Sequence, residues 1–445
     1  MGIKVALHNL GCKVNAYEVE AMQQLLEEAG YDIVPFEPGA DVYLINTCTV
    51  TNIADRKSRQ MLHKAKKMNP DAIVVATGCY VQTDEGKLDK DEAVDLILGN
   101  NQKGNIVQVL QEYEQQHTKQ KHVLNINQTK EYEELAINHT AEHVRAYIKV
   151  QDGCNQFCTY CIIPYLRGPY RSVPMEQLLA EARELADNGV RELILVAQET
   201  TLYGKDLYGE KSLPKLLHEL AQIPGIYWIR IQYCYPEEIT DELIQTIKSE
   251  EKVCHYLDIP IQHASDRILR RMGRRTHKAE LKERISTLRR EIPDIALRTT
   301  FICGFPGETQ EDHEELMEFV DEMEFERVGV FTYSAEEDTP AYSYPDQIPE
   351  KVKEERRADV MELQQEIAFE HCENMVGKVL DVMIEGKVAD EPAYVGRTYM
   401  DAPNVDGLIF VNADEMLMSG DFVRVKVTGA SEYDLIGEVY HESAE

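Results

Sequence analysis

The sequence predicts an α/β protein with three parts: a Rossmann-like parallel sheet, a partial TIM-barrel-like core and a small antiparallel β-barrel. The length of 445 residues fits about three domains, at roughly 100–200 residues each. Short apolar runs alternate with helical stretches over residues 1–110 and again from 144 to about 335, which is typical of parallel sheets with crossover helices. After residue 376, short alternating strands separated by Gly and Asp indicate an antiparallel barrel.

The first domain, residues 1–110, alternates apolar runs with amphipathic segments. We expect strands at 3–10, 41–46, 72–77 and 95–98, and helices at 14–29 and 53–68. Residues 111–143 are rich in Gln, Glu, Lys and His, with few apolar residues at either period, and predict a linker.

The second domain, residues 144–348, repeats strand and helix at about thirty-residue spacing, which favours a βα barrel or a large part of one. Its expected strands are 145–150, 192–196, 227–231, 256–259, 295–302 and 327–331, with helices such as 174–188 and 213–221 between them. A charged connecting helix, 349–375, leads to the third domain, 376–445. The strands expected in this last domain are 378–384, 394–399, 408–411 and 422–429.

The composition is that of a folded globular protein, with 43% apolar and 28% charged residues. No apolar stretch approaches about eighteen residues and no basic leader precedes an apolar run, so we expect no membrane span, no secretion and a cytoplasmic location. The formal net charge of −32 argues against non-specific coating of nucleic acid. Any nucleic-acid site must therefore be a local patch.

Three of the ten cysteines cluster as C-x3-C-x2-C, at Cys154, Cys158 and Cys161. Three thiolates on one tight loop can hold three corners of a [4Fe-4S] cluster and leave the fourth iron open. An open iron is what the amino and carboxylate groups of S-adenosylmethionine (SAM) need for radical cleavage. The alternatives are a zinc site completed by His or a distant Cys, and three buried structural thiols. Zinc ligands usually come as paired C-x2-C motifs, and the sequence has no second pair.

The residues around this loop carry a specific resemblance. Residues 153–164, Gly-Cys-Asn-Gln-Phe-Cys-Thr-Tyr-Cys-Ile-Ile-Pro, followed by Arg167-Gly168, resemble the methylthiotransferase branch of the radical SAM superfamily. The resemblance implies a radical SAM core, an amino-terminal methylthiotransferase domain with three more cysteines, and an RNA-binding TRAM barrel at the carboxyl end.

Cys12, Cys48 and Cys79 each follow a predicted strand of the first domain. The carboxyl ends of parallel strands gather at one edge of a sheet, so these cysteines can meet despite their distance in sequence. From the residues alone they could also be ordinary core thiols. The resemblance implies that they hold an auxiliary [4Fe-4S] cluster that carries or activates sulfur. The expected cofactors are thus two [4Fe-4S] clusters and SAM.

Polar residues at the ends of the core strands are candidates to bind SAM. The resemblance implies this role for Gln198, Glu199, Gln262 and Arg298, and the alternative is that they are satisfied within the barrel. The expected protein partners are a low-potential electron donor such as a flavodoxin or ferredoxin, and a sulfur donor.

The segment Gly11-Cys-Lys-Val-Asn15 with Tyr17-Glu18 looks closest to the tRNA enzymes that act on N6-threonylcarbamoyladenosine at nucleotide 37. The expected substrate is therefore the tRNA anticodon stem-loop, which would receive a methylthio group. Basic segments 56–67 and 264–290, the latter with a local charge of +7, could contact phosphates. Enzymes acting on isopentenyladenosine, or on an aspartate of ribosomal protein S12, share both cysteine triads and are alternatives.

The third domain departs from the RNA-binding expectation. Residues 376–445 hold five Lys or Arg against fourteen Asp or Glu, so RNA could be bound only by a narrow face around Arg397, Arg424 and Lys426.

A hypothesis of another class is a cluster-bearing RNA-binding or electron-transfer protein without radical catalysis. A third is a radical methyltransferase with one cluster and a structural amino-terminal domain. Cleavage of SAM to 5′-deoxyadenosine would exclude the protein without radical catalysis. Added sulfur in the product would exclude the radical methyltransferase.

Overall fold

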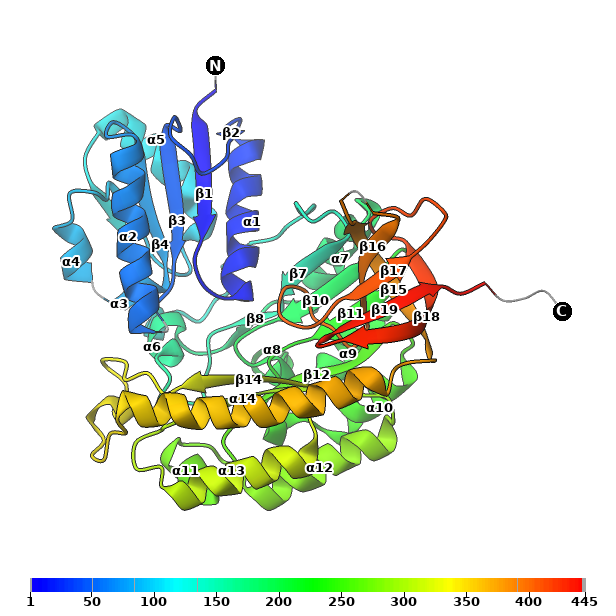
Figure 1. The fold of residues 1–445 in the computed structure, drawn as a ribbon. Helices are drawn as coiled ribbons and strands as arrows, with labels where there is room; N and C mark the ends of the chain where they lie inside the picture. The colour runs from blue at the N-terminus through cyan, green and yellow to red at the C-terminus, as the bar shows by residue number, and fades with distance from the viewer. Residues whose placement is uncertain (1, 50, 84, 134, 390, 442–445) are drawn as a thin grey trace.

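The computed structural model describes residues 2–49, 51–83, 85–133, 135–389 and 391–441. Figure 1 shows the amino-terminal sheet standing beside a larger core, with the carboxyl-terminal barrel against the core's other end. The predicted fold class is confirmed in all three parts. Within the described residues, no helix has both the length and the apolar character needed to cross a membrane.

The amino-terminal domain is a six-stranded sheet of order β2-β1-β3-β4-β5-β6, parallel throughout. Its helices lie on both faces, because alternate residues of the buried strands need an apolar layer on each side. Helices α1 and α5 cover one face and α2 the other. The bounds are β1 Lys4–Asn9, β2 Asp32–Ile33, β3 Val42–Thr47, β4 Ile73–Gly78, β5 Leu96–Leu98, β6 Gln120–His122, α1 Lys13–Glu28, α2 Asn52–Met68, α3 Cys79–Thr83, α4 Glu85–Asp89 and α5 Ile106–Gln116.

The segment expected to be a linker contributes to both neighbouring domains. Helix α5 runs to Gln116, and β6 pairs with β5 at the edge of the first sheet. Further along, Leu135 and Ile137 are buried in the core cluster that Tyr17 of α1 also joins. The polar composition of 111–143 hid these contacts because an edge strand needs only backbone hydrogen bonds.

The core is a second parallel sheet, of order β14-β13-β12-β11-β10-β7, with helices packed along it. The strands are β7 Arg145–Lys149, β10 Glu192–Val196, β11 Trp228–Ile231, β12 Val253–Gln262, β13 Ala296–Cys303 and β14 Arg327–Thr332. The larger helices are α7 Met175–Asp187, α9 Leu213–Ala221, α10 Asp241–Ser249, α12 Lys278–Glu291 and α13 Gln310–Met323, and α14 Glu350–Glu373 runs along β14.

The carboxyl-terminal domain is a closed barrel of order β15-β16-β17-β19-β18. Its strands are β15 Val379–Lys387, β16 Ala393–Thr398, β17 Ile409–Asn412, β18 Phe422–Ser431 and β19 Asp434–Val439. Arg397, expected on an RNA-facing surface, is instead buried and pairs with Glu192 at the start of β10, with Nη2 2.5 Å from Oε2. The guanidinium holds the pKa of Glu192 at about 2 despite burial, which would raise it.

A buried carboxyl on α7 helps to join the first domain to the core. Glu181 Oε1 accepts a hydrogen bond from the Ile137 N–H at 3.0 Å and lies 3.0 Å from the Tyr17 hydroxyl. Burial raises the pKa of Glu181 to about 8, although these two hydrogen bonds oppose the rise. The folded chain therefore keeps this proton at pH values where the unfolded chain has released it.

We expect this carboxyl to give stability a pH dependence that Glu181→Gln removes. Below pH ~4.5 both states are protonated; as pH rises toward about 8, the wild type loses stability because burial of the charge becomes costly. The variant should lose less, by an amount on the order of a few kcal/mol at pH 8. Denaturant unfolding at pH 5, 6.5 and 8 measures the difference, and parallel pH curves would contradict the assignment.

Candidate active site

Three cysteines of the amino-terminal domain lie where strands β1, β3 and β4 end. Cys12 is the N-cap of α1, Cys48 follows β3, and Cys79 opens α3 directly after β4. Because β1, β3 and β4 are neighbours in this order and are parallel, their carboxyl ends meet at one edge of the sheet. We call these residues the amino-terminal triad.

The loops that carry the first two cysteines are in direct contact. Gly11 has φ +120°, and a Cβ there would lie only 3.1 Å from Cys48 Sγ. The Asn15 side chain donates to the carbonyls of Leu10 at 2.9 Å and Thr47 at 3.2 Å, so it ties the two loops together. Glycine is required at this close approach because any side chain would displace the cysteine.

Cys79 reaches the same place through a second tight turn. Gly78 has φ +94°, and a Cβ there would lie 2.4 Å from the Thr47 carbonyl oxygen. The Cys79 thiol is buried, with Asn100 Nδ2 4.0 Å from its Sγ, and it interacts electrostatically with Cys12. The structure therefore places the three cysteines at the carboxyl ends of three neighbouring parallel strands, at one edge of the sheet.

The second group of cysteines lies on a closed loop of the core. Strands β8 Gln151–Asp152 and β9 Arg171–Ser172 pair antiparallel and hold the two ends of the loop, which also contains the short helix α6 Ile163–Arg167. Within it, the Cys154 N–H donates to the Gly168 carbonyl at 3.1 Å and the Cys161 N–H to the Cys158 carbonyl at 2.9 Å. We call Cys154, Cys158 and Cys161 the loop triad.

The thiols of the loop triad are chemically suited to a metal cluster. Burial raises the pKa of Cys154 to about 12 and that of Cys161 further, and the neighbouring Cys158 adds to both shifts. A bound cation would supply the compensation that buried thiolates need. No group of three His, Cys, Asp or Glu side chains in the described residues could hold one metal ion, but the cysteines of a cubane bind different irons and lie farther apart.

Two of the four polar candidates lie against this loop. Gln198 Oε1 accepts a hydrogen bond from the Gly153 N–H at 2.8 Å, so Gln198 fixes the residue before the loop triad. Glu199 is buried and accepts from the Thr201 N–H at 3.0 Å and the Tyr235 N–H at 3.4 Å. Burial raises the pKa of Glu199 to about 8, and its Oε2 has no hydrogen-bond partner within the described chain.

The other two candidates lie on neighbouring strands of the core. Gln262 ends β12 with φ +79°, at the carboxyl end of the strand. Arg298 of β13 donates a hydrogen bond through Nη1 to Asp406 Oδ1 at 2.6 Å. Asp406 lies in a loop of the carboxyl-terminal barrel. This hydrogen bond, made by Nη1, also links the core to the carboxyl-terminal barrel.

A buried arginine and tyrosine beside the loop triad were not predicted as site residues. The Tyr235 hydroxyl lies 3.5 Å from Cys158 Sγ, and the Arg274 guanidinium lies 3.8 Å from the centre of the Tyr235 ring. Arg274 is only 6% exposed, although it belongs to the basic segment that was expected to contact RNA. A run of arginines in a sequence predicts an exposed segment. The burial of Arg274 could therefore be found only from the folded structure.

Four of the ten Lys and Arg residues of that basic segment pair with the acidic run at residues 308–326. The ion pairs that join the two are Arg267–Asp312, Lys278–Glu315, Lys282–Glu322 and Arg289–Glu326. This run holds ten Asp or Glu and no Lys or Arg, and α13 carries seven of the ten. Part of the local charge of +7 is therefore neutralised within the fold, and Arg274 is buried.

A cavity of about 550 Å³ lies between the three domains and reaches one cysteine of the amino-terminal triad, Cys12. Its lining includes Cys12 and Lys13 from α1, Tyr147 and Tyr233 from the core, and Asn404 from the carboxyl-terminal barrel. Tyr233 interacts electrostatically with Cys12 and has φ +62°, an uncommon conformation for a bulky residue. The cavity thus leaves Cys12 accessible from outside the protein, whereas Cys48 and Cys79 are buried.

Family models match all three parts of the chain. The radical SAM superfamily matches residues 148–320, the uncharacterized protein family UPF0004 residues 4–99, and the TRAM domain residues 376–439. Among solved structures, the radical SAM methyltransferase TsrM from Kitasatospora setae superposes with a TM-score of 0.55 at 15% identity, covering 77% of each chain. The fold and the loop triad thus define a radical SAM protein.

Curated relatives narrow the class. The ribosomal protein uS12 methylthiotransferase RimO of Lachnoclostridium phytofermentans is 51% identical, over 98% of this chain and 99% of its own. Enzymes of the same name from Thermoanaerobacter sp. and Clostridium novyi are each 44% identical over nearly the full length of both chains. This chain belongs to the radical SAM methylthiotransferase family, whose enzymes use SAM and [4Fe-4S] clusters, as expected from the sequence.

The comparison corrects the expected partner. The sequence analysis predicted tRNA, whereas these relatives are named for action on ribosomal protein uS12, so the tRNA prediction is wrong. The structure agrees with the correction, because Arg397 is buried and four cations of the basic segment 264–290 pair with acidic residues of 308–326.

Proposed function

We propose that this chain attaches a methylthio group to ribosomal protein uS12, on an aspartate side chain. The observation that carries the proposal is similarity over the whole chain, all three domains included, to enzymes named for that substrate. The acidic carboxyl-terminal barrel, with five Lys or Arg against fourteen Asp or Glu, supports a basic protein partner over RNA. Ribosomal proteins are basic because they bind RNA.

The two triads are proposed as the two cluster sites. We assign the first [4Fe-4S] cluster, with SAM, to Cys154, Cys158 and Cys161, and the second to Cys12, Cys48 and Cys79. When bound, a cluster with an iron not held by protein supplies the electron that cleaves SAM. The protein holds the loop that carries Cys154, Cys158 and Cys161. The hydrogen bond from the Gly153 N–H to Gln198 Oε1 contributes to this.

We propose that Gln198, Glu199, Gln262 and Arg298 surround SAM. Glu199 has the clearest support, since its buried Oε2 lacks a hydrogen-bond partner in the described residues and can accept one from a ligand. The cavity lined by Cys12, Tyr147 and Tyr233 would admit the uS12 loop.

Full-length uS12 should acquire a methylthio group when incubated anaerobically with the reconstituted enzyme, SAM, sulfide and a low-potential reductant. Peptide mass spectrometry would locate the group on an aspartate, and SAM labelled in its methyl group would show the label in the product. We expect uS12 with that aspartate replaced by Asn to remain unmodified.

A parallel incubation with unmodified bulk tRNA serves as the comparison, followed by nucleoside analysis. Methylthio nucleosides in tRNA together with unmodified uS12 would overturn the proposed substrate. A methylated product without added sulfur would instead favour a radical methyltransferase.

A further inference from the structure

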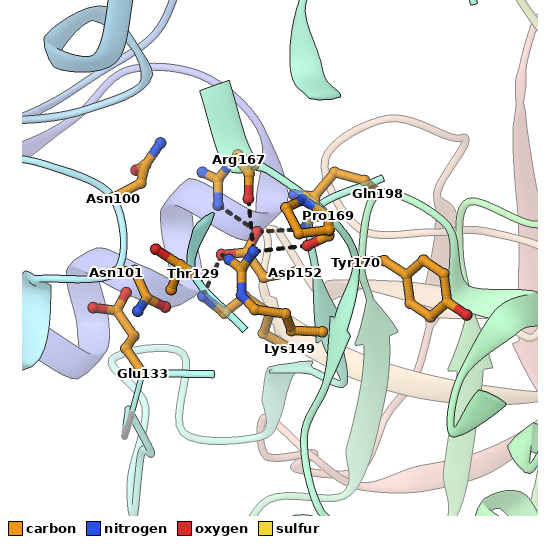
Figure 2. Close-up of polar contacts among 12 residues, drawn as sticks. Asn100, Asn101, Thr129, Glu133, Lys149, Asp152, Arg167, Pro169, Tyr170 and Gln198 are labelled. Atoms are coloured by element: carbon orange, nitrogen blue, oxygen red, sulfur yellow. Dashed lines mark hydrogen bonds and ion pairs between the residues drawn. The ribbon is translucent and has the colours of Figure 1, made fainter. Parts of the chain in front are cut away.

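Arg167 lies between the two cysteine triads and is fully buried. It ends α6, six residues after Cys161, yet it reaches across to α1 of the amino-terminal domain. Nη1 donates to Glu18 Oε1 at 2.7 Å and to Asp152 Oδ1 at 2.9 Å, and Nη2 donates to Asn15 Oδ1 at 2.8 Å. Figure 2 shows Asp152 at the centre of this group, with Arg167 and Lys149 on either side.

The carboxylates around Arg167 are held ionised by several cations at once. Burial alone would raise the pKa of Glu18, but Arg167, Lys103 and Lys149 together lower it well below its usual range. Lys149 Nζ lies 3.0 Å from Glu18 Oε1 and Lys103 Nζ 3.2 Å from Oε2. Lys103 and Lys149 thus also neutralise Glu18. Neutralising this carboxylate therefore does not by itself require an arginine at position 167.

The Nε–H of Arg167 is not used by this network. Nε is buried and has no hydrogen-bond partner among the residues that the structure describes. A buried donor left unpaired costs about 1–3 kcal/mol, and more when it belongs to a charged group. Some acceptor near the amino-terminal triad is needed to remove that cost.

Cys79 of the amino-terminal triad lies against α6. Cys79 packs against Ile162 and Leu166 in one buried apolar cluster. The Asn100 side chain donates to the Leu166 carbonyl at 3.0 Å, with the same Nδ2 4.0 Å from Cys79 Sγ. Arg167 also interacts electrostatically with both Cys79 and Cys12.

We propose that Arg167 is a positioning residue of the amino-terminal cluster, donating its Nε–H to a sulfur atom of that site and raising the cluster's reduction potential. The inference rests on the proposed function, because it requires a cluster at Cys12, Cys48 and Cys79. A hydrogen bond and a positive charge near cluster sulfur stabilise the more negative, reduced state. Since Arg167 follows the loop triad in the chain, one side chain also fixes the two cluster sites relative to each other.

The test uses the full chain with the loop triad replaced by alanine, so that only the amino-terminal cluster is present. After anaerobic reconstitution, we would measure iron content and the midpoint potential by a redox titration followed by electron paramagnetic resonance. Arg167→Gln should move the midpoint to a more negative potential and alter the spectrum. Arg167→Lys, which keeps the charge, should recover part of the shift in potential.

Lys149→Met is the matched control. It removes a cation from the same carboxylate, Glu18, and the ion pairs of Lys149 are with carboxylates, Glu18 at 3.0 Å and Asp152 at 3.6 Å. We expect it to lower thermal stability while leaving the midpoint potential unchanged. An equal shift in Lys149→Met, or no shift in Arg167→Gln, would overturn the inference.

A paired variant, Glu18→Gln with Arg167→Met, removes the cation and its carboxylate together and guards against misfolding of the single variant. It should show a negative shift in potential that is smaller than that of Arg167→Gln, because the loss of the Glu18 charge offsets the loss of the cation and only the hydrogen bond is missing. Loss of iron from the folded Arg167 variants alone would support the positioning role through cluster assembly. Absence of iron from the parent protein would refute the cluster site itself, and with it the proposed function.

Discussion

Replacing Cys154 with alanine is expected to abolish reductive cleavage of SAM. The structure holds Cys154 on the short loop closed by β8 and β9, beside Cys158 and Cys161. Loss of a group that merely orients a metal ligand costs about 10–100-fold, so loss of a ligand should lower 5′-deoxyadenosine formation by more than about 100-fold. Chromatography of anaerobic reactions with dithionite as reductant measures this product directly.

Cys372→Ala is a suitable control for that experiment. Cys372 is also a buried cysteine, but it lies on α14 and belongs to neither triad. The control should keep SAM cleavage near the wild-type rate. Wild-type cleavage by Cys154→Ala would remove the loop triad from the site. A wild-type protein that carries its clusters but cannot cleave SAM would instead favour a cluster-bearing electron-transfer protein.

The main strands could be predicted because burial on both faces leaves a continuous apolar run. Residues 42–47 and 73–78 are such runs, and they form β3 and β4 within a residue or two of the expected bounds. Strands β2 and β6 escaped prediction because they have two or three residues each and lie at the sheet edges. Strand β19, Asp434–Val439, was also missed, since Asp and Gly interrupt its apolar pattern.

The cysteines could be found from the sequence, but their surroundings could not. Local spacing identifies Cys154, Cys158 and Cys161, and strand ends place Cys12 near its partners. Arg167 and Arg274 owe their burial to packing between segments far apart in the chain, which no local pattern encodes. A charged side chain is exposed by default, so burial of these two arginines contradicts the ordinary expectation for their type.

The substrate was the least predictable property. The motif around Cys12 describes a cluster site that several substrate groups share, so it cannot specify what approaches the cavity. The charge of the carboxyl-terminal barrel was the one local feature that disagreed with tRNA. Burial of Arg397 against Glu192 strengthens that disagreement, because it removes a cation from the barrel's surface.

The second large effect is expected when Cys12, Cys48 and Cys79 are all replaced by alanine. The three thiols meet at one edge of the first sheet, and the loop triad lies on a separate loop of the core. The variant should therefore still cleave SAM to 5′-deoxyadenosine but add no methylthio group to uS12. The iron content should fall from about eight atoms per chain in the wild type to about four in the variant, because each [4Fe-4S] cluster holds four irons.

The separation of the two activities is what makes this variant informative. Retained cleavage with lost sulfur insertion assigns the sulfur step to the amino-terminal triad, because the radical step then proceeds without it. About four irons in both proteins would instead show that these cysteines are structural, and that the enzyme works with a single cluster. Normal methylthio product from the variant would contradict the role of the triad, whatever its iron content.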